Sequence, residues 1–283
     1  MIDRAGPFQA LEHHFEVRSD VPGALDVVTR LFAGFASAAS NERRIVYKLR
    51  RPTADPNYEI FTDGELLHAG IDAGSLVDWL IFDVGRRAYA SSHPFVVLHA
   101  GVVSLNGRGI ILPAPQEHGK STLTTALVRA GFGFLSDEAA PIDPRTGTVE
   151  PFPRPILLSP RSLALFPGMA EGLPGEYERF RNYRYHLTGE DVRIGSHAGS
   201  CPIDLIVAPR YEPHAATELE SLSAADCLRL LLDQCLNPYR IEGQAIQALA
   251  NVVEGSRRFR LTTSDVPAAV EEIFRLADAA RRP

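Results

Sequence analysis

A phosphate-loop pattern at residues 114–121 constrains this chain more than any other feature of its sequence. The Walker A pattern is G-x-x-x-x-G-K-[ST]; the matching residues here, with the one that follows, are Ala114, Pro115, Gln116, Glu117, His118, Gly119, Lys120, Ser121 and Thr122. Such a loop holds phosphates with backbone N–H groups, a lysine and a hydroxyl that ligates Mg²⁺. Lys120 and Ser121 supply the last two groups, and Gly119 permits close approach of the backbone. Ala114 replaces the first glycine, so the loop requires a negative φ at that residue.

The segments around this loop follow the order strand, strand, loop, helix. Two apolar runs, 95–105 and 109–112, are joined by Asn-Gly at 106–107, a strong signal for a tight hairpin. Residues 122–130 carry apolar side chains at helical spacing, and Gly131 ends the pattern. The loop is therefore predicted to lead from a strand into a helix, whose N-terminus favours an anion.

Two acidic residues follow the next predicted strand, at 132–135. Asp137 and Glu138 stand where this strand ends, and paired carboxylates can hold Mg²⁺ and accept a proton from an attacking hydroxyl. The alternative is a solvated turn that leads into a hairpin at 142–147. Combined with Lys120 and Ser121, the acidic pair favours a phosphoryl-transfer site in which Ser121, Asp137 and Glu138 are the metal ligands.

Several stretches together resemble a known family of kinases. Residues 98–101 (Leu-His-Ala-Gly), 119–122 and 131–138 are similar to the core of HPr kinase/phosphorylase. They are closer still to the HprK-related kinases found beside peptide-modification genes. The likeness continues through residues 151–155 and, more faintly, through 208–211 and Asn237, and it covers about the last two-thirds of the chain.

This resemblance implies an α/β fold with a phosphoenolpyruvate-carboxykinase-like P-loop kinase core that uses ATP and Mg²⁺. It also implies that Asp137 is the catalytic base and that His99 lies near it and near the phosphates. The chain departs from the family at Glu138, where the family has a second aspartate, and at Glu117 and His118, where it has small residues. A carboxylate that faced the phosphates would repel them, so the side chain of Glu117 is expected to point away from the nucleotide.

Arg154 is a further candidate for the catalytic site, because a guanidinium group matches phosphate oxygens in a bidentate manner. The alternative is a loop arginine in a proline-rich segment. Residues 168–200 are rich in Gly, Arg and Tyr and show no clear element, which predicts a mobile loop, a lid or an acceptor-binding flap, or else a disordered surface loop. His186, His197 and His214 lack metal-site spacing and are expected at the surface.

Two domains are expected. Residues 1–92 contain a predicted helix at 21–39, strands at 45–50 and 58–61, and an amphipathic helix at 75–89. They read as a small N-terminal α+β accessory domain, with an extension of the kinase sheet as the alternative. His-Pro at 93–94 breaks the pattern, and residues 93–283 form the predicted kinase domain.

Composition limits the classes of partner and the location. The 283 residues carry a net charge of −6, with 29 basic and 35 acidic residues, which disfavours a nucleic-acid partner. No apolar run is long enough to span a membrane, and the first residues do not begin a signal peptide. Three cysteines without a C-x-x-C pair are typical of reduced thiols, so a cytoplasmic location is expected. A homo-oligomer is left open.

The leading hypothesis is a kinase that moves the γ-phosphate of ATP to a hydroxyl, foremost of Ser or Thr in a peptide or small-protein acceptor. Lys120 would neutralise the outer phosphates, and Asp137 would orient and deprotonate the acceptor. Three alternatives remain: a kinase for small-molecule hydroxyls, a non-catalytic nucleotide-binding module that shapes a partner surface, and a structural remnant that binds no nucleotide.

Overall fold

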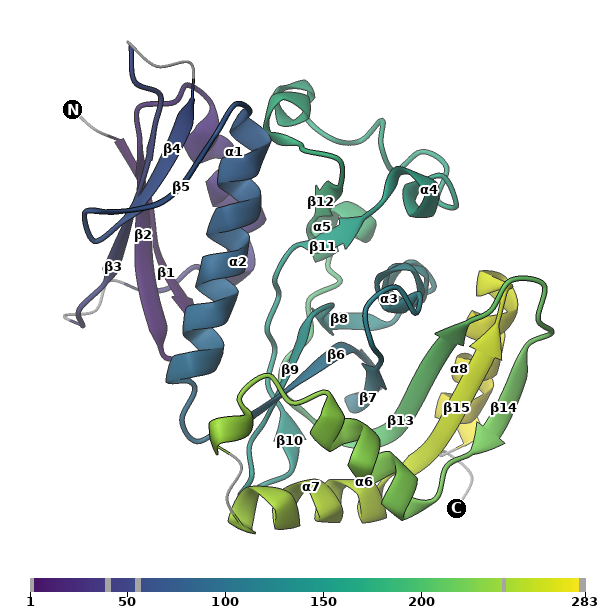
Figure 1. Cartoon of the computed structure of the whole chain (residues 1–283). Coiled ribbons are helices and arrows are strands. Elements are labelled where there is room, and N and C mark those ends of the chain that lie inside the picture. Colours follow the sequence, from purple (N-terminus) through teal and green to yellow (C-terminus); the bar gives the residue numbers. More distant parts are fainter. Residues whose placement is uncertain (1–2, 39–41, 54–56, 241–242, 280–283) are drawn as a thin grey trace. The chain divides into compact units, whose positions relative to one another are not determined.

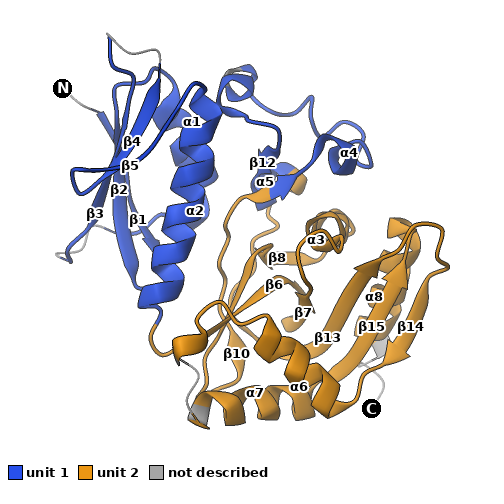
Figure 2. Ribbon diagram, viewed as in Figure 1, with its two compact units in different colours: residues 1–92, 157–191 blue, residues 93–156, 192–283 orange. Residues whose placement is uncertain are grey.

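The computed structural model describes residues 3–38, 42–53, 57–240 and 243–279 and shows a mixed α/β protein (Figure 1). The predicted α/β class is confirmed at this level. The chain forms two compact units, Met1–Ser92 with Leu157–Asp191, and His93–Ile156 with Val192–Pro283 (Figure 2). One boundary lies between Ser92 and His93, and residues 157–191 group with unit 1, although the sequence places them in the expected kinase domain. Among the helices described, none is both long and apolar enough to cross a membrane.

Unit 1 is built on a five-stranded sheet with the order β1-β2-β3-β4-β5. Its strands are β1 (Asp3–Ala10), β2 (His13–Ser19), β3 (Ile45–Arg50), β4 (Tyr58–Thr62) and β5 (Glu65–Gly70). Helices α1 (Ala24–Leu31) and α2 (Ala73–Ser91) pack on the face that carries buried aromatic side chains such as Phe15 and Tyr47. This sheet is separate from the sheet of unit 2, so residues 1–92 do not extend the latter.

Two expectations about local structure are wrong. The helix expected at 21–39 is interrupted: α1 ends at Leu31 and a 3-10 turn, η1 (Ala33–Phe35), follows. Gly34 lowers the helix propensity there, and the tighter turn buries Phe35 in the core.

The second error concerns residues 168–200, which contain η2 (Gly175–Phe180), β12 (Tyr185–Leu187) and α5 (Gly189–Val192) instead of a structureless loop. β12 pairs with β11 (Ile156–Leu158), and α4 (Pro160–Leu163) follows β11. Tyr177 and Phe180 are buried. His186, expected at the surface, is buried as well, and its Nε2 lies 2.6 Å from Oδ1 of Asp78 on α2. Its partner lies far away in sequence, which periodicity does not reveal.

Unit 2 contains an eight-stranded sheet, most of which follows the order β10-β9-β6-β7-β13-β15-β14, with β8 paired to β6. The strands are β6 (Val96–Leu105), β7 (Arg108–Pro113), β8 (Gly133–Ser136), β9 (Ala139–Ile142), β10 (Thr148–Val149), β13 (Cys201–Tyr211), β14 (Glu218–Ser221) and β15 (Arg257–Thr263). α6 (Ala224–Asp233) and α7 (Gly243–Gly255) share a buried cluster with Leu98, Ala100 and Val102 of β6. The residues that alternate with these along β6 point to the other face of the sheet. There Gly101 contacts α3 (Lys120–Arg129), and α3 packs beside α8 (Val266–Ala279).

Strand directions gather the predicted site residues at one edge of this sheet. β7 and β13 run parallel, so the loop after Pro113 and the end of β13 meet at the same edge. β6 runs antiparallel to β7, with Ala100 opposite Pro113, which brings the start of β6 to that edge. β8 also pairs antiparallel with β6, and the residues after Ser136 emerge there too. Segments distant in sequence therefore converge on the phosphate-loop pattern.

Candidate active site

The loop between β7 and α3 has the backbone of a tight cradle. Ala114 is buried, whereas Pro115, Gln116 and Glu117 are exposed. Two residues adopt left-handed backbone angles, Glu117 with φ 66° and Gly119 with φ 84°. α3 begins directly afterwards, and Gly119 offers no side chain to cap it. The N–H groups of the first helical turn have no intrahelical acceptor and are therefore available to an anion.

Replacing Glu117 by glycine is expected to stabilise the fold by about 1 kcal/mol, because a left-handed φ costs a non-glycine residue roughly that much. The affinity for ATP should change less than threefold, since the exposed carboxylate lies in solvent. Thermal denaturation and calorimetry measure the two effects. Gln116→Gly, in the same loop at a residue without positive φ, is the control and should lower stability. A tenfold or larger gain in ATP affinity for Glu117→Gly would instead show that the carboxylate faces the phosphates.

Lys120 and His99 form the centre of the site. Nζ of Lys120 lies 2.5 Å from Nε2 of His99, and Nδ1 of His99 lies 3.3 Å from Oε1 of Gln234. Burial, reinforced by the charge of Lys120, lowers the pKa of His99, so the imidazole is neutral. Lys120 then donates to Nε2, and the Nδ1–H group donates to Gln234, a tautomer assigned from this hydrogen-bond network. Burial also lowers the pKa of Lys120, an effect that Asp137 and Glu138 oppose.

Asp137 is the most strongly perturbed acid of the site. The residue is 3% exposed, and burial raises its pKa to about 7, against the attraction of Lys120 and a hydrogen bond with Ser121. Within the described chain its Oδ1 atom has no hydrogen-bond partner. A buried, unsatisfied carboxylate oxygen beside a phosphate-loop lysine is suited to take a proton or contact a ligand near neutral pH.

Glu138 lies between two basic groups. Its Oε1 is 3.4 Å from Nη1 of Arg154 and 3.7 Å from Nε2 of His99. Burial favours the protonated form, but the charges of Arg154 and Lys120, with a hydrogen bond from Arg154, outweigh it and keep the pKa of Glu138 below its usual value. The side chain of Arg154 is 14% exposed, so this arginine is held beside Glu138 even though residues 151–155 form no helix or strand.

Sequence reasoning missed two residues that support the site. Gln234, directly after α6, makes two hydrogen bonds with His99. Its side-chain oxygen accepts from Nδ1, and its backbone oxygen accepts from the backbone N–H group of His99 at 2.7 Å. Gly101 lets α3 approach β6: a Cβ atom there would lie 2.5 Å from Oγ1 of Thr124 and 3.4 Å from Cγ of Lys120. Nothing in the local pattern around Gln234 points to His99, which lies 135 residues away.

These residues fit a nucleotide phosphate chain with a magnesium ion. The first-turn N–H groups of α3 and the ammonium group of Lys120 would donate hydrogen bonds to the phosphates. The Ser121 hydroxyl and the carboxylates of Asp137 and Glu138 are oxygen ligands of the kind that Mg²⁺ prefers. In the part of the chain that the structure describes, no three His, Cys, Asp or Glu side chains form a metal-binding cluster. Phosphate oxygens and water would therefore complete the coordination, as is usual for magnesium–nucleotide sites.

The pKa of Asp137 predicts a pH-dependent stability. Because its pKa in the folded protein exceeds the unfolded value of 3.8, folding takes up a proton, and the free energy of unfolding falls as pH rises from about 4 to 7. In the Asp137→Asn variant, the free energy of unfolding should not fall in this way as pH rises. Without nucleotide and metal, the variant should match the wild type near pH 4 and exceed it by up to about 4 kcal/mol near pH 8.

Denaturant unfolding across this pH range measures the difference. Asp143→Asn is a control of opposite sign, because hydrogen bonds from Arg145 lower the pKa of Asp143. That carboxylate contributes stability above its unfolded pKa, so its loss should destabilise the protein most at high pH. A pH-independent difference between Asp137→Asn and the wild type would contradict the raised pKa.

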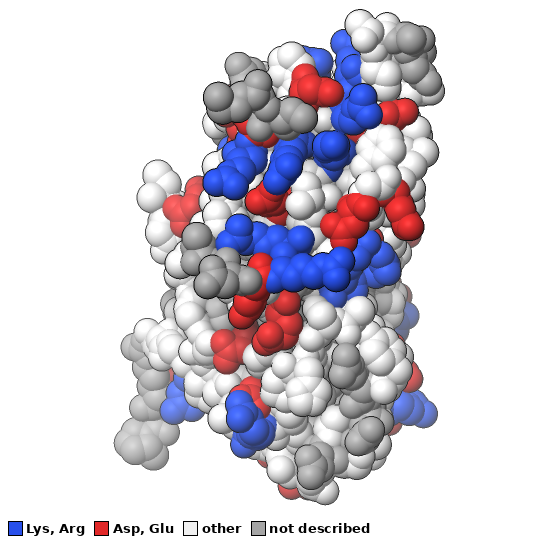
Figure 3. Space-filling model, turned by 90° about the vertical axis from the view of Figure 1, so that its left-hand side faces the viewer, with Lys and Arg blue, Asp and Glu red and all other residues white. Residues whose placement is uncertain are grey.

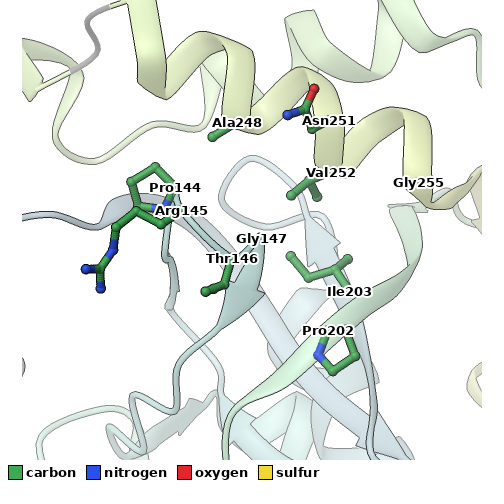
Figure 4. Close-up of a pocket in the computed structure, with 10 residues that line it drawn as sticks. All are labelled: Pro144, Arg145, Thr146, Gly147, Pro202, Ile203, Ala248, Asn251, Val252 and Gly255. Carbon is green, nitrogen blue, oxygen red and sulfur yellow. The ribbon is translucent and has the colours of Figure 1, made fainter.

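A separate cavity of about 250 Å³ lies in unit 2 where the turn after β9 faces α7 (Figure 4). Its lining includes Ile203, Val252 and Asn251, and its one charged side chain, Arg145, is paired with Asp143 at 3.2 Å. It contains none of the phosphate-loop residues and is distinct from the site described above.

Comparisons with known proteins give a weak structural similarity but no match to a family model or a curated sequence. A scan against protein-family models gives no match, and a search of curated proteins gives none either. Among solved structures, the chain is similar to the Hpr(Ser) kinase/phosphatase from Coxiella burnetii. The two are 12% identical, the match covers 65% of this chain and 97% of the other, and the TM-score is 0.33. At this TM-score the two chains need not share a topology, so function has to be argued from the residues of the site.

Proposed function

We propose that unit 2 is an ATP-dependent kinase domain that transfers the γ-phosphate of ATP to a hydroxyl group of Ser or Thr in a peptide or small protein. The observation that carries the proposal is Asp137, a buried carboxylate whose pKa is raised to about 7 and which hydrogen-bonds with Ser121 of the phosphate loop. A general base works best with a pKa near the working pH, and phosphoryl transfer to a hydroxyl needs a base in this position.

The finer fold assignment is part of the same proposal. We infer a phosphoenolpyruvate-carboxykinase-like P-loop core, because residues 98–101, 119–122 and 131–138 resemble HPr kinase/phosphorylase. The strand directions support this inference, since they bring these three stretches to one edge of the sheet.

Each residue then has a distinct task. Lys120 leaves its contact with His99 and binds the outer phosphates of ATP. The N–H groups at the start of α3 bind phosphate oxygens. Ser121 and Glu138 are the residues that would hold Mg²⁺, which when bound neutralises charge on the transferring phosphoryl group. Arg154 balances Glu138 and lies close enough to attract an anion.

Asp137 completes the reaction. The acceptor hydroxyl gives its proton to the Asp137 carboxylate while its oxygen bonds to the γ-phosphorus, and the bond from that phosphorus to the oxygen of ADP breaks. His99 stays neutral and, once Lys120 turns to the phosphates, keeps its orientation through Gln234. Burial of Asp137 and Lys120 excludes water that would otherwise compete with the acceptor.

The proposal is tested with the full chain in two steps. Calorimetry with Mg²⁺ and ATP should show saturable binding. Incubation with ATP and a library of Ser- and Thr-containing peptides, together with a panel of small hydroxyl compounds, should then yield a phosphorylated peptide by mass spectrometry. Absence of ATP binding at millimolar concentration would refute the proposal. Binding without transfer to any hydroxyl would favour a non-catalytic nucleotide-binding module, and transfer to small compounds alone would favour a small-molecule kinase.

A further inference from the structure

The sheet of unit 1 has one face that no helix in the described residues of this unit covers. Both α1 and α2 pack on the opposite face, where Ala5, Val17, Tyr47 and Ile60 are buried. Residues next to these along each strand point to the uncovered face, because side chains alternate. The exposed side chains of this face, such as Arg4 and Lys48, are therefore available to a partner.

Cross-strand register aligns five side chains of this face in one row. Arg4 of β1 lies opposite Arg18 of β2, and Arg18 lies opposite Lys48 of β3. Lys48 lies opposite Phe61 of β4, and Phe61 lies opposite Leu66 of β5. We call this the cation–apolar row: three basic side chains on adjacent strands, followed by two apolar ones.

Ion pairs neutralise the basic half of the row only in part. Glu16 pairs with Arg18 at 2.6 Å and reaches Arg4 at only 3.9 Å, so one carboxylate serves two guanidinium groups. Lys48 has no ion-pair partner among the residues whose positions are described. Figure 3, which is turned toward the strands of unit 1, shows Lys and Arg side chains gathered on this face with acidic side chains among them.

Composition alone does not account for this arrangement. Residues 1–92 contain more acidic than basic residues, so the row concentrates positive charge in an otherwise acidic region. Like charges directly opposite on neighbouring strands destabilise a sheet. An anionic partner would offset this repulsion, which gives such a row a role in binding rather than in stability.

The apolar half defines the partner further. Leu66 is 56% exposed, and the guanidinium group of Arg50 lies 6.0 Å from the centre of the Phe61 ring. Exposed apolar side chains rimmed by polar ones are typical of protein interfaces. A nucleic acid is disfavoured by the net charge of −6.

We propose that the cation–apolar row docks an acidic peptide segment of a partner protein, with its carboxylates on Arg4, Arg18 and Lys48 and an adjoining apolar side chain on Phe61 and Leu66. Neighbouring strands lie about 4.8 Å apart, so the row spans about 19 Å, the length of about six extended residues. This docking concerns residues of unit 1 alone and does not depend on the proposed kinase activity. If that activity holds, the row is suited to recruit the acceptor protein.

Charge reversal tests the basic half. The probe is a fluorescein-labelled peptide of about 12 residues, glutamate-rich in its first half and leucine-rich in its second, titrated with the full chain by fluorescence anisotropy. Arg4→Glu with Lys48→Glu should raise the Kd at least tenfold. Arg161→Glu with Arg184→Glu makes the same charge change at exposed residues of unit 1 outside the sheet and should alter the Kd less than twofold. Equal effects of the two double variants would overturn the proposal.

A second comparison tests the apolar half and the class of partner. Leu66→Ser should weaken binding of this probe at least threefold, yet leave a peptide with serine in place of every leucine unaffected. A single-stranded oligonucleotide of equal length should bind more weakly than the probe and show no dependence on Leu66. Oligonucleotide binding as tight as that of the probe would overturn the proposal in favour of a general polyanion site. Circular dichroism and melting temperature confirm that each variant is folded.

Discussion

Asp137→Asn is expected to lower the rate of phosphoryl transfer at saturating ATP at least a hundredfold, the lower end of what a positioned general base contributes. Asparagine keeps the shape of the side chain but cannot accept the proton of the acceptor hydroxyl. Affinity for ATP should change much less, because the first-turn N–H groups of α3 and Lys120 remain. Steady-state kinetics and calorimetry on the same preparation separate these two quantities.

The pH profile adds a second criterion for Asp137. Since the base is active only when ionised, the wild-type rate should rise with pH through about 7, and the residual rate of the variant should not. Asp143→Asn, on the turn after β9, is a matched control that should leave transfer unchanged. Transfer by Asp137→Asn near the wild-type rate would place the base elsewhere, and His99 would be the first residue to examine.

Lys120→Met is expected to weaken ATP binding by a hundredfold or more. A lysine within about 4 Å of a phosphate contributes up to roughly 4 kcal/mol where the effective dielectric constant is near 20, and each 1.4 kcal/mol is a tenfold change in affinity. Methionine fills the space of the buried lysine stem, and because burial lowers the pKa of Lys120, the variant should be at least as stable as the wild type. Calorimetry with Mg²⁺ and ATP, together with a thermal melt, measures both effects.

The matched control for Lys120→Met is a substitution at Arg129 on the same helix. Arg129 lies exposed in the last turn of α3, so Arg129→Met removes one positive charge without touching the phosphate loop. Its affinity for ATP should stay within about twofold of the wild type, because exposed charges more than a Debye length apart are screened. Unchanged ATP affinity in a folded Lys120→Met variant would refute the phosphate-loop interpretation.

Sequence reasoning was most successful where the signal was local. The hairpin at 106–107, the loop before α3 and the acidic pair after β8 were all visible as short patterns, because each depends on neighbouring residues. The helix expected at 21–39 shows the limit of this approach: helical periodicity continued past Leu31, but burial of Phe35 and a glycine at 34 favoured a tighter turn.

The loop expected at 168–200 was wrong for a different reason. The Gly- and Arg-rich composition of this segment indicated no regular element, yet Tyr177 and Phe180 are buried within unit 1 and His186 pairs with Asp78. Asp78 lies 108 positions from His186 in sequence, and composition alone carries no information about such a partner.

The sequence by itself determined the chemical groups of the candidate site: a lysine and a hydroxyl after a glycine turn, two adjacent carboxylates at the end of a strand, and a histidine and an arginine in flanking segments. Only the tertiary structure decided how they act on one another. The antiparallel pairing of β6 with β7 and β8 brings His99 to Lys120, burial moves the pKa of Asp137 to about 7, and Gln234 fixes the tautomer of His99. These are effects of dielectric environment and long-range contact, which arise only when strands distant in sequence lie side by side.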